Sequence, residues 1–146
     1  MNVGLLLSEL AANKADETAI LFNESTYTYG NLNTIADSLA ENLAKYGVKQ
    51  GDSIAVILPN CPEFAFVYFA ASKLGAIFCP IDVRLGEAEI NHILNSTKTR
   101  VCFTFPDFPH KDKLNHAVRN MDITSEEFKS LINNPTELRD ITTDID

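Results

Sequence analysis

The side chains that could act as nucleophiles, bases or metal ligands are few and lie far apart in this sequence of 146 residues. They comprise three cysteines and three histidines: Cys61, Cys79, Cys102, His92, His110 and His116. No CxxC pair, HExxH, GxSxG or paired-carboxylate motif occurs, so the spacing indicates neither a zinc ribbon nor a disulfide framework. One loose set, Cys102 with His110 and His116, is a conceivable metal site; the alternative is that the three side chains never meet.

Three single residues have a functional and a structural interpretation. Cys61 stands at the start of an expected helix, where a thiolate is stabilised, or it is a small packing residue of the first turn. Asp82 follows the carboxyl end of an expected strand, where α/β folds place site residues; otherwise it forms a turn or caps the helix after Arg84. His92 lies beside the apolar face of an amphipathic helix and is expected at the surface rather than in a metal site.

Phosphate binding has no local signature in the sequence. The six glycines stand too far apart for a GxGxxG or P-loop cradle, at positions 4, 30, 47, 51, 75 and 86. The net charge of −8 argues against nucleic acid and against an anionic membrane surface, because both attract basic patches. No signal peptide is recognisable and no apolar run approaches the ~18 residues of a membrane span, so the sequence predicts a cytoplasmic protein.

Strands and helices alternate through most of the chain. We expect a short helix over 3–13, a hairpin of strands 19–22 and 25–29, and a helix between Thr28 and Gly47. Apolar strands are expected at 53–58, 76–80 and 100–105, with helices at 62–74 and 85–96 between them. A proline loop at 105–110 and helical patterns at 111–119 and 124–132 follow. This order predicts an α/β fold with a parallel sheet.

Residues at the ends of the expected helices predict where each begins and stops. Thr28 and Asn60 are expected as amino-terminal caps, because their side-chain oxygens can accept hydrogen bonds from free amides. Asn31 stands where a capping box prefers Glu or Gln, and we expect it to weaken the first cap. Gly47 and Gly75 suit the left-handed position after a helix, and Pro80-Ile81-Asp82 marks the exit from a strand.

The helix expected at 62–74 has almost no polar side. Residues 64–71 are all apolar, whereas a helix on one face of a sheet normally keeps a polar face for water. Successive helical residues point about 100° apart, so the large side chains between 64 and 69 cannot all face one sheet. The sequence therefore predicts that something other than this chain's own strands covers the helix, either a missing part of a longer protein or a second copy of the chain.

The acidic charge is concentrated near the carboxyl end. Residues 122–146 hold seven acidic and two basic residues. We therefore expect residues 1–121 to form an α/β subdomain and residues 122–146 to form an acidic tail.

The segments TYTYGNLNTIADSLAENLAKYGV, LPNCPEF, SKLGAIFCPID and RLGEAEINHIL follow one another in the order and spacing of a known family. Together they resemble the N-terminal region of adenylate-forming, AMP-binding enzymes, and the match covers roughly residues 1–105. Thr28-Tyr29 with Leu32 resembles the first core motif of the family, and the segment from Ser72 to Asp82 resembles the second. LPNCPEF and RLGEAEINHIL are typical of the acyl-CoA ligase branch.

The resemblance implies a reaction in the parent enzyme rather than in this chain. In the family, a carboxylate attacks the α-phosphate of ATP to give an acyl-adenylate, and the thiol of coenzyme A then displaces AMP, with Mg²⁺ assisting. The phosphate loop, the nucleotide and magnesium motifs and the catalytic lysine of the family come later in its chains, and none is found here. We therefore nominate no catalytic, cofactor-binding or metal-binding residue, and expect no cofactor in this chain.

The sequence leads to one main hypothesis and two alternatives. The main hypothesis is an incomplete N-terminal scaffold of an acyl-CoA ligase-like enzyme, connected with fatty acid metabolism, inactive alone and partnered by the downstream part of the parent. The first alternative is a self-standing α/β binding or interaction module. The second is a flavodoxin-like or receiver-like domain, which would need a phosphate loop or an acidic cluster.

Overall fold

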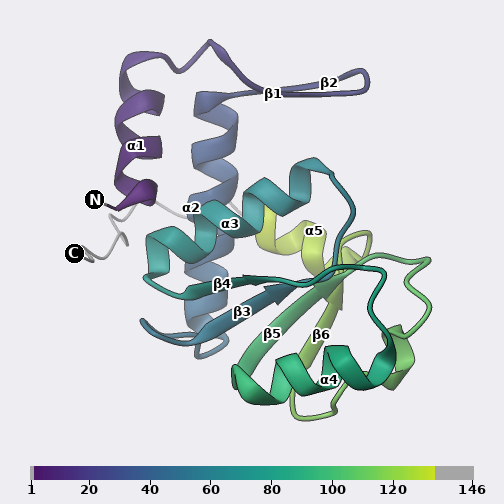
Figure 1. Cartoon of the computed structure of the whole chain (residues 1–146). Coiled ribbons are helices and arrows are strands. Elements are labelled where there is room, and N and C mark those ends of the chain that lie inside the picture. The colour runs from purple at the N-terminus through teal and green to yellow at the C-terminus, as the bar shows by residue number, and fades with distance from the viewer. Residues whose placement is uncertain (1, 134–146) are drawn as a thin grey trace.

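A computed structural model describes residues 2–133 of the chain and shows a parallel sheet with helices on both faces (Figure 1). The helices are α1 (Val3–Asn13), α2 (Tyr29–Lys45), α3 (Pro62–Leu74), α4 (Glu87–Ser96) and α5 (Glu126–Asn133). The strands are β1 (Thr18–Phe22), β2 (Ser25–Thr28), β3 (Ser53–Val56), β4 (Ile77–Pro80), β5 (Thr99–Thr104) and β6 (Arg119–Asp122), and a short 3-10 turn spans Lys111–Lys113.

The main sheet has the strand order β4-β3-β5-β6, and all its neighbouring strands are parallel. The predicted fold class, an α/β scaffold with a parallel sheet, is therefore confirmed. β1 and β2 form a separate antiparallel hairpin, which extends away from the body of the molecule above α3 (Figure 1). The hairpin turns at Asn23, whose positive φ of 52° an asparagine tolerates better than most residues.

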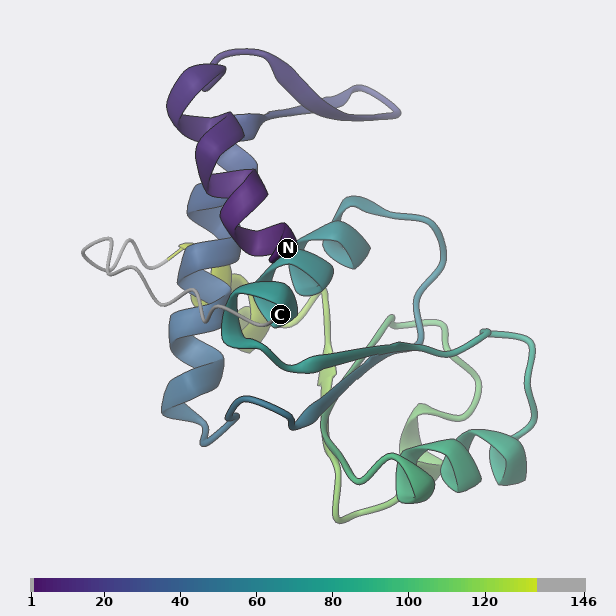
Figure 2. The same cartoon turned by 60° about the vertical axis from the view of Figure 1, so that its left-hand side comes forward.

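Alternate residues of the central strands face two different hydrophobic cores. In β3, Ile54 and Val56 join the core under α1, α2, α3 and α5, whereas Ala55 joins the core under α4. Figure 2 shows α4 on one side of the sheet, and α2 and α3 on the other. A strand covered on both faces has no side that water can solvate, which explains why residues 54–56 of β3 and 101–103 of β5 are all apolar.

The ends of α2 and α3 test the predicted caps. The Thr28 hydroxyl accepts a hydrogen bond from the Asn31 amide at 3.0 Å, and the Asn31 side chain accepts one from the Thr28 amide at 3.0 Å. Asn31 therefore completes a capping box, contrary to the expectation that it would weaken the cap. Gly47 and Gly75 have φ values of 91° and 69°, which confirms both predicted helix ends. The prediction that Asn60 caps α3 is wrong, because the cap residue is Cys61 and its side chain makes no capping hydrogen bond.

The segment after residue 105 differs most from the expected elements. The helix expected at 111–119 is a single 3-10 turn followed by β6, which sequence analysis missed. The expected division after residue 121 cuts through β6, and α5 then packs back on the core with Phe128 and Leu131 buried. The Ser38 hydroxyl and the Asn42 amide both donate to the Leu131 carbonyl oxygen, at 2.8 and 3.0 Å. Residues 122–133 therefore pack with the body of the fold, and the rest of the expected tail lies outside the described residues.

The cover over α3 also differs from the expectation. α1 and α2 of the same chain pack against α3, and α1 lies on the side of α3 that faces away from the sheet (Figure 2). Phe66 and Val67 are buried, and Phe64, Tyr68 and Phe69 are half-buried. The large exposed apolar side chains lie elsewhere: Leu6, Leu21, Phe22, Tyr46 and Ile77. Association with another chain stays a prediction, but its physical basis is no longer α3.

Within residues 2–133, no helix combines the length and the apolar character that crossing a membrane requires.

Candidate functional site

The loose set of Cys102, His110 and His116 does not form a site. Cys102 lies in β5 inside the core under α4, and burial raises the pKa of its thiol to about 12. His110 packs edge-on against Phe108, and His116 is exposed in the loop before β6. Over the described part of the chain, no three His, Cys, Asp or Glu side chains gather closely enough to hold a metal ion.

For Cys61 and His92, the structure favours the structural interpretation over a role in chemistry. The Cys61 thiol is half-buried at the start of α3, and burial raises its pKa although the backbone amides of Phe64 and Glu63 oppose the shift. A thiol with a raised pKa is a poor nucleophile near neutral pH, because the thiolate is the reactive form. His92 is exposed on α4, as predicted.

Asp82 forms a turn at the exit from β4. Its carboxylate accepts hydrogen bonds from the Arg84 backbone amide at 2.9 Å and from the Arg84 guanidinium at 2.7 Å. These hydrogen bonds lower the pKa of Asp82 to about 2. A carboxylate that Arg84 holds in its charged form makes a poor general base, so the local turn accounts for Asp82.

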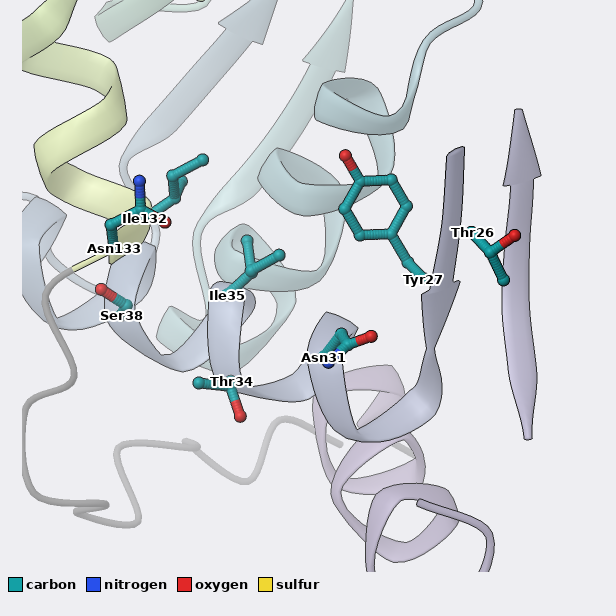
Figure 3. Close-up of a pocket in the computed structure, with 8 residues that line it drawn as sticks. All are labelled: Thr26, Tyr27, Asn31, Thr34, Ile35, Ser38, Ile132 and Asn133. Carbon is teal, nitrogen blue, oxygen red and sulfur yellow. The ribbon is translucent and has the colours of Figure 1, made fainter. Parts of the chain in front are cut away.

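A cavity of about 400 Å³ lies between β2, α2 and the end of α5. Figure 3 shows the side chains that line it: Thr26, Tyr27, Asn31, Thr34, Ile35, Ser38, Ile132 and Asn133. Hydroxyls and amides supply its polar atoms, and no carboxylate, imidazole, thiol or amine is among the lining side chains. Several of these groups already have structural partners, since Asn31 completes the capping box and Ser38 binds the Leu131 carbonyl.

The one titratable group of this cavity belongs to Tyr27. Its ring packs edge-on against Phe66, with the ring centroids 5.2 Å apart. Burial, and next the charge of Glu63, raise the pKa of Tyr27 above its ordinary value. The phenol therefore stays protonated at neutral pH. The cavity can offer hydrogen bonds to a neutral molecule, but its lining lacks the paired acid and base that proton-transfer chemistry needs.

A buried polar cluster joins three helices, and sequence reasoning missed it. The Lys73 ammonium on α3 lies 2.7 Å from the Asp37 carboxylate on α2 and donates a hydrogen bond to the Ser8 hydroxyl on α1 at 2.9 Å. The Asn33 amide lies next to it, 3.5 Å from Asp37. The Lys73 side chain is 1% exposed and that of Asp37 17%. A buried ion is stable only with such partners, so the cluster fixes how the helices pack.

The signal for this cluster was the lysine itself. Lys73 is the one cation in a helix that is otherwise almost entirely apolar, and Asp37 follows the apolar Ile35 and Ala36 on α2. Charged residues are almost never fully buried without a partner, so a lysine in such a helix implies a carboxylate nearby. The carboxylate partner of Lys73 depends on how α2 crosses α3. The sequence of either helix alone does not predict this crossing.

Residues 2–133 do not fit a nucleoside triphosphate or its magnesium ion. They bring together no group of His, Cys, Asp or Glu side chains that could hold the ion, and their glycines serve local packing or turns instead of a phosphate cradle. Gly4 is an example: a Cβ there would come within 2.8 Å of the Lys73 Cγ, so glycine allows α1 to approach α3. The geometry of residues 2–133 therefore provides a sheet covered on both faces and a cavity lined by hydroxyls and amides.

Comparisons with known proteins give the chain a family context. The sequence profile described as AMP-binding enzyme matches residues 7–143. A crotonobetaine/carnitine–CoA ligase from Citrobacter koseri is 32% identical over 112 residues, which are 73% of this chain and 22% of the relative. The ligase of the same name from Salmonella arizonae is 34% identical over 68% of this chain and 20% of its own length. The chain thus spans about a fifth of the length of these curated relatives.

Solved structures share the fold. The N-terminal domain of FACL13 from Mycobacterium tuberculosis matches 94% of this chain with a TM-score of 0.82 and 25% identity, over 38% of its own chain. A fatty acyl CoA synthetase from the same organism matches 94% of the chain and 30% of its own length, with a TM-score of 0.81 and 23% identity. The fold of residues 2–133 therefore corresponds to the N-terminal region of these enzymes.

Proposed function

The chain belongs to the AMP-binding enzyme family, and from this premise we propose that it forms the N-terminal scaffold of an ATP-dependent acid–CoA ligase. In the complete reaction, a carboxylic acid would be activated as its acyl-adenylate and then transferred to coenzyme A. The observation that supports this function is the match of residues 7–143 to the family together with ligases among the relatives. ATP, Mg²⁺ and coenzyme A would bind mainly to parts of the enzyme other than residues 2–133.

The scaffold role has a physical basis in the fold. The parallel sheet is covered on both faces, and the cluster of Lys73, Asp37 and Ser8 holds α1, α2 and α3 in one arrangement. A reaction centre needs supporting elements that do not shift when substrates bind, because misplacement by about 1 Å can cost on the order of 100-fold in rate. The proposed contribution of this chain is such support, and its partner is the remainder of the ligase.

A chimera tests the proposal. In the Citrobacter koseri ligase, the 112 matched residues would be replaced by the matching residues of this chain. The expected chimera ligates coenzyme A to the acid of the parent ligase, because the replaced segment supports the reaction centre without forming it. A second chimera that carries Lys73→Met serves as the matched control and should lose thermal stability. A first chimera that folds as the parent does, yet forms no acyl-adenylate, would contradict the proposal.

A further inference from the structure

Two contacts with Lys73 fix the position of α1 against α3. Ser8 accepts a hydrogen bond from the buried Lys73 ammonium at 2.9 Å, and Gly4 brings the α1 backbone against Lys73. A hydrogen bond to a buried charge and a close backbone contact both allow little sliding of one helix along another. α1 therefore cannot easily collapse toward the hairpin, and a space that it borders stays open.

Such a space of about 310 Å³ lies between α1, the hairpin, α2 and α3. Hydrocarbon side chains line it, with the Tyr29 hydroxyl as the one polar side-chain group: Val3, Leu6, Leu7, Leu10, Ala19, Ile20, Tyr29, Leu32, Ala65 and Phe69. Leu6 is 42% exposed, so the cavity reaches the surface beside it. No lining residue carries a charge. We call this space the α1 cavity.

We propose that the α1 cavity is a binding site for a small uncharged hydrocarbon group. An apolar cavity of about 150 Å³ lined by Leu, Ile and Phe is known to stay dry and to take up benzene, and the α1 cavity offers the same kind of lining with more room. An ion would lose its hydration there without gaining a partner, so charged molecules of the same shape are excluded. This inference does not depend on the proposed function, because it rests on the lining of the α1 cavity and involves no step of the ligase reaction.

Three compounds that share a fluorophenyl ring test the site by fluorine NMR on the purified chain. Fluorobenzene is neutral, para-fluorobenzoate is an anion, and para-fluorobenzylammonium is a cation. We expect saturable line broadening for fluorobenzene and at least about tenfold weaker binding of both ions. The cation is the decisive comparison, because the net charge of −8 would favour it if general electrostatics controlled binding. Absence of saturable fluorobenzene binding, or equal binding of the cation, would overturn the proposal.

Variants place the bound ring in the α1 cavity. Ala65→Leu adds volume to the cavity wall and should weaken fluorobenzene binding at least about tenfold. Ala88→Leu, an exposed position on α4, is the matched control and should leave binding unchanged. If Ala65→Leu does not fold, Ala19→Val fills the same space from β1. Unchanged binding by a folded cavity variant, or a loss caused equally by Ala88→Leu, would show that the ring binds elsewhere and would overturn the assignment.

Discussion

The Lys73 ammonium and the Asp37 carboxylate lie 2.7 Å apart in the interior, where they join α3 to α2. Ser8 extends this contact to α1, so one polar cluster connects three helices that are far apart in the sequence. The apolar core supplies most of the burial, but a buried ion pair restricts which packing of the helices is acceptable, because alternatives leave a charge without a partner.

Lys73→Met should lower the free energy of unfolding by about 3 kcal/mol, because it leaves Asp37 without its counter-ion in a mostly buried position. Urea denaturation of the two proteins measures the difference. Lys45→Met is the control, since Lys45 is 62% exposed beside Glu41 and an exposed pair contributes about 0–1 kcal/mol. Equal unfolding midpoints for the two variants would show that the buried pair adds nothing beyond a surface pair.

Removal of the α2 cap should lower the free energy of unfolding, whereas substitution of Asn60 should leave it nearly unchanged. Thr28→Ala deletes the hydroxyl that accepts from Asn31 and should cost about 0.5–2 kcal/mol. Asn60 is exposed, and α3 is capped at Cys61 without a side-chain hydrogen bond, so Asn60→Ala should change stability by less than about 0.5 kcal/mol. Thermal unfolding at one protein concentration compares them. A larger loss for Asn60→Ala than for Thr28→Ala would reverse this assignment of caps.

The Asp82 carboxyl should titrate well below an ordinary aspartate. Hydrogen bonds from Arg84 lower its pKa from 3.8 to about 2. A lowered pKa in the folded state means that the pair stabilises the fold above the ordinary pKa, and that this contribution disappears as the pH falls from about 4 through about 2. Arg84→Gln should return the Asp82 pKa toward 3.8. Carboxyl carbon shifts followed by NMR measure both proteins, and identical titrations would refute the assigned cause.

Thiol reagents should distinguish the three cysteines. Cys102 is fully buried and burial raises its thiol pKa to about 12, so it should react only after unfolding. Cys61 and Cys79 are half-buried with raised pKa values and should react slowly in the folded protein. Mass spectrometry after alkylation with and without urea identifies the sites. Rapid labelling of Cys102 without urea would mean that β5 is open to solvent.

The spacing of apolar residues and the order of the expected strands and helices predicted most of the fold. α1, α3 and the glycines that end α2 and α3 follow from local patterns, and the parallel sheet follows from apolar strands that alternate with helices. β6 was missed because Arg119, Asn120 and Asp122 make its sequence polar, and only its place beside β5 makes it a strand. The sequence around β6 does not show that β5 pairs with it.

The cover of α3 and the buried cluster depended on long-range packing. The apolar residues all around α3 correctly predicted a helix that is covered on two sides. The second cover comes from α1 and α2 of the same chain, which the sequence analysis did not predict. Lys73 and Asp37 are 36 positions apart, and Ser8 is 65 positions from Lys73, so no window around one residue contains the others. The sequence indicated neither cavity, because residues from several separate elements line each one. The expectation that the chain holds no catalytic residue stays a prediction.

Pyrophosphate exchange into ATP tests the central claim most directly, because it reports acyl-adenylate formation without requiring the second step. The purified chain would be incubated with Mg²⁺-ATP, labelled pyrophosphate and a panel of carboxylic acids, with the intact Citrobacter koseri ligase and its own acid as the positive control. We predict that the ligase exchanges label and that the chain does not, with any acid. Acid-dependent exchange by the chain alone, abolished when the acid is omitted, would contradict the proposal that these residues support the reaction without performing it.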